Sequence, residues 1–145
     1  MALSQNIKTI WQHLISKNTF GSVLQKIDIL SAENGKCTAE LKVSDEHANS
    51  MGNLHGGMTA TIVDVVSTLA LTTSKRAAIG VSVDMSIMYL KGAPIGELVI
   101  ISANTLKAGK TLAFLEVMIS KKSNGDLVAK GCHTKFIGSE SPLPK

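Results

Sequence analysis

The sequence has few of the residues that mark extracellular, nucleic-acid-binding or metal-binding proteins. Its two cysteines, Cys37 and Cys132, lie far apart and form no Cys-x-x-Cys pair, which indicates reduced, apolar side chains of an intracellular protein. Trp11 and Tyr89 are the only residues of their types, and the basic residues are scattered, so nucleic acid is a weak candidate for a partner. No metal site or cofactor is predicted, because no ligand-like spacing relates the four histidines, His13, His47, His55 and His133.

Segments that would direct the chain to or across a membrane are also missing. Residues 1–18 contain no basic region followed by an apolar core and a cleavage site, and they contain no arginine, so neither a secretory signal nor a transit peptide is indicated. The apolar run from Met58 to Leu71 is too short and too rich in Ser and Thr to span a bilayer. We therefore expect a cytosolic location and no stable membrane insertion.

The length and charge of the chain set further bounds. The 145 residues suffice for one domain with a hydrophobic core that needs no disulfide or metal. We expect this domain to span residues 1–138, followed by a flexible tail over residues 139–145. The 15 basic and 11 acidic side chains give a net charge of +4, which suits an anionic small ligand or simple solubility.

The most informative stretch is His55-Gly56-Gly57 and the apolar run that follows it, Met58 to Thr73. The run contains no Gly or Pro and a single charge, Asp64, and it predicts a helix that is buried nearly all round. Asp is a mediocre helix former and is rarely buried without a partner, so its position favours a functional carboxylate over a structural one. Asp64 belongs to a narrow, small or polar seam at helical spacing, formed by Thr61, Asp64, Ser67, Thr68 and Leu71.

The rest of the chain predicts one more helix and six strands. Ser4 is a plausible N-cap of the first helix, and two Asn-Gly pairs are typical of β-hairpin turns. Between the first hairpin and the buried helix, the loop Ser44–Leu54 carries a dense cluster of polar side chains of the kind that often serves function. The expected segments are a helix at Ser4–Asn18, strands within Val23–Leu30, Lys36–Val43, Ile79–Tyr89, Glu97–Lys107, Thr111–Lys121 and Leu127–Phe136, and turns at Asn34-Gly35, Ala108-Gly109-Lys110 and Asn124-Gly125.

This order of elements predicts an α+β fold. Alternation of apolar and polar residues from Ile79 to Tyr89 predicts a strand with two sharply different faces, and alternation from Thr111 to Ile119 gives the apolar set of another strand. A long antiparallel sheet that curls around the central helix would bury it, with three or four late strands in a meander. The long edge strands would then favour dimerisation.

The motifs resemble those of a known family. The run Asn49–Gly57, the helix acid Asp64 and the later run Val81–Met85 together resemble the hotdog-fold acyl-CoA thioesterases of the cytosol and mitochondria. The similarity extends along almost the whole chain, from the first helix through residues 109–114 to residues 133–135. It implies a hotdog domain that works as a dimer of dimers, with each active site at a dimer interface, acyl-CoA as substrate and a role in fatty acid and lipid metabolism.

The resemblance also assigns site residues. Its catalytic positions fall on Asn49, Gly56, Asp64 and Ser82, and we add His55 as a positioning residue. The loop at residues 91–94 is unusual for the family, and Phe136 stands where a relative carries a polar residue, so the grip on CoA and the choice of acyl chain stay open. The expected substrate contacts are Gly57, Asp84, Tyr89, Leu90, Lys91, Gly92, Ala93, Pro94, Lys107, Ala108, Gly109, Lys110, Thr111, Leu112 and Phe136.

The chemistry of thioester hydrolysis gives these residues roles. Free N–H groups at Gly56-Gly57 and the positive end of the helix dipole would receive the oxyanion. Asp64 would act as general base or as nucleophile, and the residues alone do not choose between the two. Asn49 would orient water or the thioester, and Ser82 would orient the water. Each also has an ordinary structural alternative. The glycine pair would be a plain turn into a helix, Asn49 a loop or capping residue, and Ser82 an inert strand serine.

We therefore predict hydrolysis of medium- to long-chain fatty acyl-CoA to a free fatty acid and CoA. The alternatives are a hotdog thioesterase for aromatic acyl-CoA, a hotdog hydratase, and a non-catalytic protein that binds acyl-CoA. Intact Asn49, Asp64 and Ser82 argue against the last of these, because binding alone requires none of them.

Overall fold

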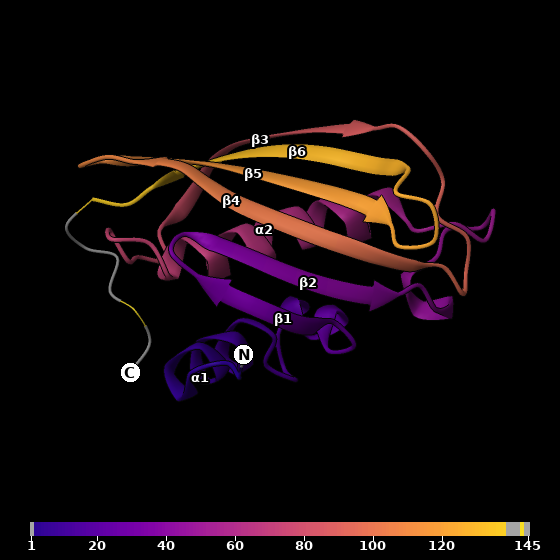
Figure 1. The fold of residues 1–145 in the computed structure, drawn as a ribbon, viewed down its shortest axis with the longest axis horizontal. Coiled ribbons are helices and arrows are strands. Elements are labelled where there is room, and N and C mark those ends of the chain that lie inside the picture. Colours follow the sequence, from indigo (N-terminus) through magenta and orange to yellow (C-terminus); the bar gives the residue numbers. More distant parts are fainter. Residues whose placement is uncertain (1, 139–142, 144–145) are drawn as a thin grey trace.

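The structure is a computed structural model that describes residues 2–138 and residue 143 (Figure 1). Six antiparallel strands form one sheet in the order β1-β2-β4-β5-β6-β3, and the central helix α2 contacts all six. The elements are α1 (Gln5–Leu14), η1 (Phe20–Leu24), β1 (Asp28–Glu33), β2 (Lys36–Lys42), η2 (Asp45–His47), α2 (Gly56–Thr72), β3 (Val81–Tyr89), β4 (Leu98–Ala108), β5 (Leu112–Lys121) and β6 (Leu127–Phe136). This arrangement confirms the predicted α+β fold.

The first helix lies on the outside of the domain, beside β1, as expected (Figure 1). Its N-cap is Ser4, whose hydroxyl accepts a hydrogen bond from the Ile7 N–H at 3.3 Å. Ile7, Ile10 and Trp11 form its buried face. The helix ends at Leu14, short of the predicted Asn18, and the segment expected to begin the first strand opens instead with the 3₁₀ helix η1.

Both Asn-Gly pairs form the expected turns. Asn34 and Gly35 have φ values of 52° and 76°, which is the pattern of a two-residue turn with both central residues left-handed, and Gly125 has a φ of 77°. The inward residues of β2 and β5 are buried as their alternation predicts. Thr111 is an exception, because it precedes β5 and is exposed.

Strand β3 differs from its prediction in burial. It pairs only with β6, at the edge of the sheet, so the meander consists of β4, β5 and β6 alone. A bulge between Ser82 and Asp84 shifts the register, and the predicted apolar face is broken there. Val81 and Val83 are 64% and 60% exposed, because no further strand of the described chain covers this edge.

The same open edge explains why α2 is less buried than predicted. Most of the helix is buried, but the side chain of Asp64 is 45% exposed, because the helix faces the uncovered margin of the sheet there. The premise that Asp64 is a buried charge is therefore wrong. On the rest of the seam the hydroxyls are satisfied within the helix, since Thr61 donates to the Gly57 carbonyl at 2.7 Å and Thr68 to the Asp64 carbonyl at 2.8 Å.

The residues at the C-terminal end are described only in part. The tail expected over residues 139–145 falls mostly outside the described residues, and of these Leu143 alone is described. Its side chain packs against the main hydrophobic core between the sheet and the helices. Among the helices in the described part of the chain, none has the length and apolarity needed to cross a membrane.

Helix α2 approaches β6 closely at Gly131. A Cβ atom at this position would lie 2.6 Å from Cγ1 and 2.7 Å from Cγ2 of Val63. Val63 is fully buried, and its β-branched side chain has one strongly preferred rotamer in a helix, so it cannot turn away. The absence of a side chain at residue 131 therefore sets the distance between helix and sheet.

We expect Gly131→Ala to destabilise the protein by about 1–3 kcal/mol, the usual cost of overpacking a core. Val63→Ala removes the clashing methyl groups, so the double variant should be more stable than the sum of the two single losses implies. Urea unfolding of the four proteins measures this coupling. Gly109→Ala is the matched control, because its new Cβ would meet nothing closer than the Leu112 carbonyl oxygen at 3.4 Å. Additive losses would show that the contact at residue 131 does not limit the packing.

Candidate active site

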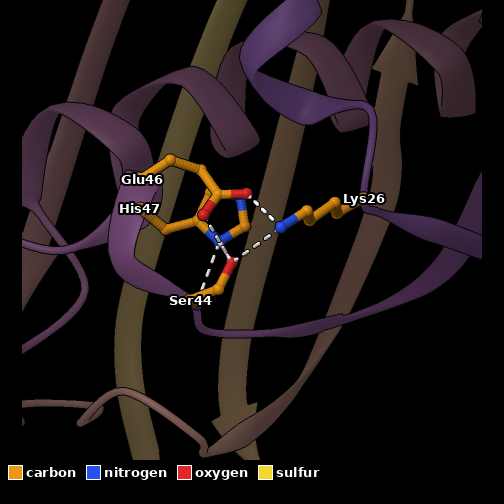
Figure 2. A network of polar contacts seen from close by, with 4 residues as sticks. All are labelled: Lys26, Ser44, Glu46 and His47. Carbon is orange, nitrogen blue, oxygen red and sulfur yellow. Dashed lines mark hydrogen bonds and ion pairs between the residues drawn. The ribbon is translucent and has the colours of Figure 1, made fainter.

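A network of polar contacts fixes the loop that precedes α2 (Figure 2). Lys26 pairs with Glu46 at 2.5 Å, and the Ser44 hydroxyl donates to Glu46 at 2.9 Å. The Ser44 N–H donates to Nδ1 of the buried His47 at 3.2 Å, and the His47 carbonyl accepts from the His55 N–H at 2.8 Å. The hydrogen bond from Lys26 is the largest of the effects that lower the pKa of Glu46 to about 2, so its carboxylate stays charged. The network thus ties the start of the loop to the start of the helix.

Asn49 lies inside this loop with its side-chain oxygen already occupied. Its Oδ1 accepts the N–H groups of Met51 at 2.9 Å and Asn53 at 3.1 Å, and its own N–H donates to the Asn53 carbonyl at 2.7 Å. Because two N–H groups point at one atom, that atom must be the amide oxygen. The side-chain NH₂ is therefore the group that Asn49 can offer to a ligand, and a carbonyl oxygen is its natural acceptor.

At the N-terminus of α2 the N–H of the first residue, Gly56, is free. Nδ1 of His55, the N-cap, accepts the Gly57 N–H at 2.8 Å, so the second glycine does not offer the free N–H that was expected. No acceptor for the Gly56 N–H is found among the residues that the structure describes. The Tyr89 hydroxyl donates to the Gly56 carbonyl at 3.0 Å and holds the Gly56–Gly57 peptide in place.

A small cavity adjoins the same helix end. Its volume is about 240 Å³. Apolar side chains from η1 and from the first turn of α2 supply much of its wall, with His55 and Gly57 at one side. The lining residues are Phe20, Val23, Glu46, Ala48, His55, Gly57, Met58 and Thr61.

A second polar cluster surrounds Asp64 and was not anticipated beyond Asp64 and Ser82. The buried ring of His133 lies between two serines, with Nε2 2.8 Å from Ser82 Oγ and Nδ1 2.8 Å from Ser67 Oγ. Nε2 is also 3.9 Å from the nearer carboxylate oxygen of Asp64. The structure thus brings Asp64 and Ser82 together, as predicted, and places His133 behind them.

One set of hydrogen-bond directions satisfies every contact in this cluster. In this set the Ser67 hydroxyl donates to the Asp64 carbonyl at 3.0 Å, which also accepts from Thr68, and it accepts from His133 Nδ1. A neutral His133 then carries its proton on Nδ1 and accepts at Nε2 from the Ser82 hydroxyl. Burial, and then the nearby Lys135, lower the pKa of His133 and keep the ring neutral, against the opposing effect of Asp64. The lone pairs of Ser82 Oγ are therefore left to accept a hydrogen bond.

Lys135 is a buried cation beneath the same stretch of α2. Its Nζ donates to Thr68 Oγ1 at 2.6 Å, and only 4% of the residue is exposed. Burial lowers its pKa to about 8, while the nearby carboxylate of Asp64 acts in the opposite direction. Asp64 thus has a positive charge on its inner side and solvent on its outer side.

The two clusters do not meet within one protomer. Gly56 and Asp64 are eight residues apart on one helix, which corresponds to about 12 Å along the axis. A nucleophile must approach within roughly 3.5 Å of a carbonyl carbon whose oxygen is about 3 Å from its donor. One thioester therefore cannot reach the Gly56 N–H and the Asp64 carboxylate of the same protomer.

The expected CoA contacts are distributed unevenly. Lys107 and Lys110 are exposed, whereas Lys91 is paired with Asp126 at 2.5 Å and Ala93 is buried. Asp84 lies on the open edge strand. The other exposed members of the expected set are Gly57, Tyr89, Leu90, Gly92, Pro94, Thr111 and Phe136, and the partly buried ones are Ala108, Gly109 and Leu112.

His133 and Lys135 were missed because both are polar residues in inward positions of β6. A signal was present, since Gly131, His133 and Lys135 alternate along the strand and all three are buried. Polar side chains on a buried face require partners, and these lie on α2, more than sixty residues earlier in the chain.

The chain is similar to known thioesterases. The model of the thioesterase superfamily matches residues 51–128. Acyl-coenzyme A thioesterase 13 of Homo sapiens is 46% identical over 138 residues, which cover 95% of this chain and 99% of that protein. The crystal structure of zebrafish thioesterase superfamily member 2 has a TM-score of 0.89 and 48% identity, covering 94% of this chain and 100% of the other. A hypothetical thioesterase of Streptococcus pneumoniae, solved with coenzyme A, has a TM-score of 0.74 and 28% identity, covering 79% and 88%.

The neutral state of His133 makes stability depend on pH. Its pKa is lowered in the folded protein from an ordinary value of 6.5, so below pH 6.5 the unfolded chain binds a proton that the folded chain refuses. Stability is then lost as the pH falls from 6.5 towards the folded pKa, by at most about 1.4 kcal/mol per pH unit for this group.

We expect His133→Gln to lower the melting temperature at pH 7.5, because two buried hydrogen bonds change, and to flatten its decline between pH 6.5 and pH 5. Thermal melts across this range measure both effects. His13→Gln, on the exposed face of α1, is the control and should keep the slope of the wild type. An unchanged slope in His133→Gln would mean that His133 takes up protons equally in both states.

Proposed function

Because the chain belongs to the thioesterase superfamily and is an acyl-CoA thioesterase, we propose that it hydrolyses medium- to long-chain fatty acyl-CoA to a free fatty acid and CoA. The cavity beside Gly57 supports an aliphatic substrate, since its apolar walls suit a hydrocarbon chain and its position is next to the helix end that would hold the thioester. The cytoplasm or the mitochondrion, the locations that the resemblance implies, remain the expected sites of this activity.

The direction of the hydrogen bonds around His133 is the observation that carries the proposed mechanism. Ser82 Oγ, which donates to His133, accepts one hydrogen of a water molecule, and Asp64 removes the other as general base. The water oxygen forms a bond to the thioester carbon, the carbon–sulfur bond breaks, and CoA leaves as a thiolate that recovers the proton from Asp64 or solvent. This arrangement favours Asp64 as a general base over Asp64 as a nucleophile. The lone pairs of Ser82 Oγ can accept a hydrogen bond only from a donor such as water, which the nucleophilic attack by a carboxylate would not supply.

The other cluster stabilises the charge on the carbonyl oxygen. The free Gly56 N–H at the positive end of the α2 dipole and the side-chain NH₂ of Asn49 are the two donors proposed for the oxyanion. His55 acts as a positioning residue, since it caps the helix and fixes the Gly57 peptide.

Two copies of the chain are needed to complete one site. Gly56 lies against Tyr89 at the end of β3, whereas Asp64 faces Ser82 near its beginning. If β3 pairs with β3 of a second copy in antiparallel fashion, the beginning of each strand lies beside the end of the other. The Asp64 cluster of one protomer then meets the Gly56 cluster of its partner, and two such sites form about the twofold axis.

This pairing also accounts for the exposed edge. A strand of nine residues with exposed Val81, Val83 and Met85 is a ready template for another strand. We propose that such dimers associate further into a dimer of dimers, and that Lys107 and Lys110 contact the phosphates of CoA as point charges.

The substrate and the role of Asp64 are tested together by release of free thiol from acyl-CoA esters of increasing chain length. We expect the wild type to prefer medium and long chains, and Asp64→Asn to lower kcat at least about a hundredfold, the usual scale for loss of a positioned base. The melting temperature should stay unchanged, because the Asp64 side chain is nearly half exposed and Nε2 of the neutral His133 is 3.9 Å away. Full activity of Asp64→Asn, or a parallel loss of activity and stability, would return Asp64 to a structural role.

The shared site is tested by mixing two inactive variants. Asn49→Ala and Asp64→Asn protomers, unfolded and refolded together in equal amounts, should recover about a quarter of wild-type turnover, because half of the dimers are mixed and each has one intact site of two. Each variant refolded alone is the control, together with wild type treated identically. A mixture that stays as inactive as its components would place each site within a single protomer.

A further inference from the structure

A second concave site lies at the opposite end of α2 from Gly56. The C-terminal turn of the helix, the Asn34-Gly35 turn and the end of β4 enclose a cavity of about 450 Å³. This volume is within the range of small-molecule sites. The cavity is lined by Asn34, Gly35, Thr73, Ser74, Lys75, Arg76, Thr105, Leu106, Lys107 and Ala108.

The charge of this cavity is of one sign. Lys75, Arg76 and Lys107 line it, and no carboxylate does. Among the described residues no hydrogen bond or ion pair is found for the ammonium groups of Lys75 and Lys107. Arg76 donates through Nη2 to the Lys110 carbonyl at 2.9 Å, which fixes its guanidinium and leaves its other N–H donors for a ligand.

The end of the helix does not require these cations. A cluster of Lys and Arg after a helix often serves to satisfy its last carbonyl groups. Here the Thr72 and Thr73 hydroxyls donate to the carbonyls of Leu69 and Ala70 at 2.6 and 2.8 Å, and the Ser74 N–H donates to that of Leu71 at 3.0 Å. Capping of the helix therefore does not account for the positive charge around the cavity.

Two hydroxyl groups at the cavity lack a partner. Ser74 Oγ and Thr105 Oγ1 are buried and have no hydrogen bond within the described part of the chain. They lie together, since a Cβ added at Gly35 would be 3.3 Å from Thr105 Oγ1 and 3.5 Å from Ser74 Cβ. A buried hydroxyl without a partner destabilises a fold. Among the residues that the structure describes, neither hydroxyl has a hydrogen bond to lose if it turns towards a ligand.

We propose that this cavity binds the phosphate group of a phosphate monoester. A dianionic group with three terminal oxygens can accept from the guanidinium, from two ammonium groups and from the two free hydroxyls at once. The cavity is larger than a bare phosphate requires, and Leu106 supplies an apolar wall for an organic part of the ligand. The phosphate belongs to the 3′-phosphate of CoA or to a separate phosphorylated small molecule. In the first case the inference rests on the proposed function.

Binding without turnover is the primary test. Calorimetric titration of the intact protein with inorganic phosphate and with adenosine 3′,5′-bisphosphate should show saturable binding. Ser74→Ala and Thr105→Val should each weaken it about fivefold, and Lys75→Met by a similar factor. Lys17→Met, an exposed lysine outside the cavity, is the matched control for general charge and should bind like the wild type.

The melting temperatures of the variants distinguish the loss of a binding site from damage to the fold. Because the two hydroxyls have no partner in the free protein, Ser74→Ala and Thr105→Val should keep or raise the melting temperature while they weaken phosphate binding. Equal affinity in the wild type, the hydroxyl variants and Lys75→Met, or no saturable binding by the wild type, would overturn the proposal.

Kinetics with two substrates, acyl-CoA and acyl-dephospho-CoA, distinguish the two sources of the phosphate. If the cavity takes the 3′-phosphate of CoA, Ser74→Ala and Lys75→Met raise KM for acyl-CoA but not for acyl-dephospho-CoA, with kcat unchanged. If neither KM changes while phosphate binding is lost, the ligand is a separate molecule. Hydrolysis by a wild type that binds no phosphate at this cavity would refute this inference and leave the proposed function intact. Phosphate binding by a wild type that does not hydrolyse acyl-CoA would refute the proposed function and leave this inference intact.

Discussion

The sheet ends at β3, and much of the molecule follows from this single constraint. Helix α2 is buried against the sheet, and the approach at Gly131 and Val63 brings it close to β6, next to the last strand. Beyond β3 the described chain supplies nothing more, so one margin of the helix and one edge of the sheet stay open together. Asp64 lies on that margin. The charge is tolerated because it keeps its contact with water, and the same opening leaves the carboxylate accessible from outside.

The polar groups beneath Asp64 are ordered by what each can donate or accept. When the Ser67 hydroxyl donates to the Asp64 carbonyl, His133 carries its proton on Nδ1 and Ser82 donates inward. The Ser82 hydroxyl, for which we propose a catalytic role, is thus oriented from the interior of the protein and not by the ligand. Such preorganisation is where electrostatic catalysis gains most, because the dipoles need not reorient during the reaction.

Local patterns in the sequence were sufficient for the turns, the alternating strands, α2 and the family. Asn34-Gly35 and the alternation in β2 depend on neighbours only, and both were predicted correctly. The two different faces expected for β3 are not found, because a bulge changes the face at Ser82, and its partner β6, which begins almost forty residues later, was not identified. The contact of Lys26 with Glu46 and those of His133 and Lys135 with α2 were missed for the same reason: nothing local identifies the partner of a polar side chain.

Lys135 and His133 are the two titratable groups under α2, and their protonation states affect the stability of the fold and the charge of the site in different ways. Lys135 has a pKa near 8 in the folded protein against an ordinary 10.5, so between these values the unfolded chain binds more protons and folding becomes more favourable as the pH rises. Yet the same loss of a proton removes the positive charge beside Asp64. His133 has the complementary effect in acid, because protonating Nε2 would turn it into a donor and reverse the Ser82 hydroxyl. The fold would therefore gain stability from a neutral Lys135, whereas the site retains its charge balance only where Lys135 is charged and His133 is neutral. In the proposed mechanism, that condition confines activity to a window around neutral pH, at a cost in stability that an apolar residue at position 135 would avoid.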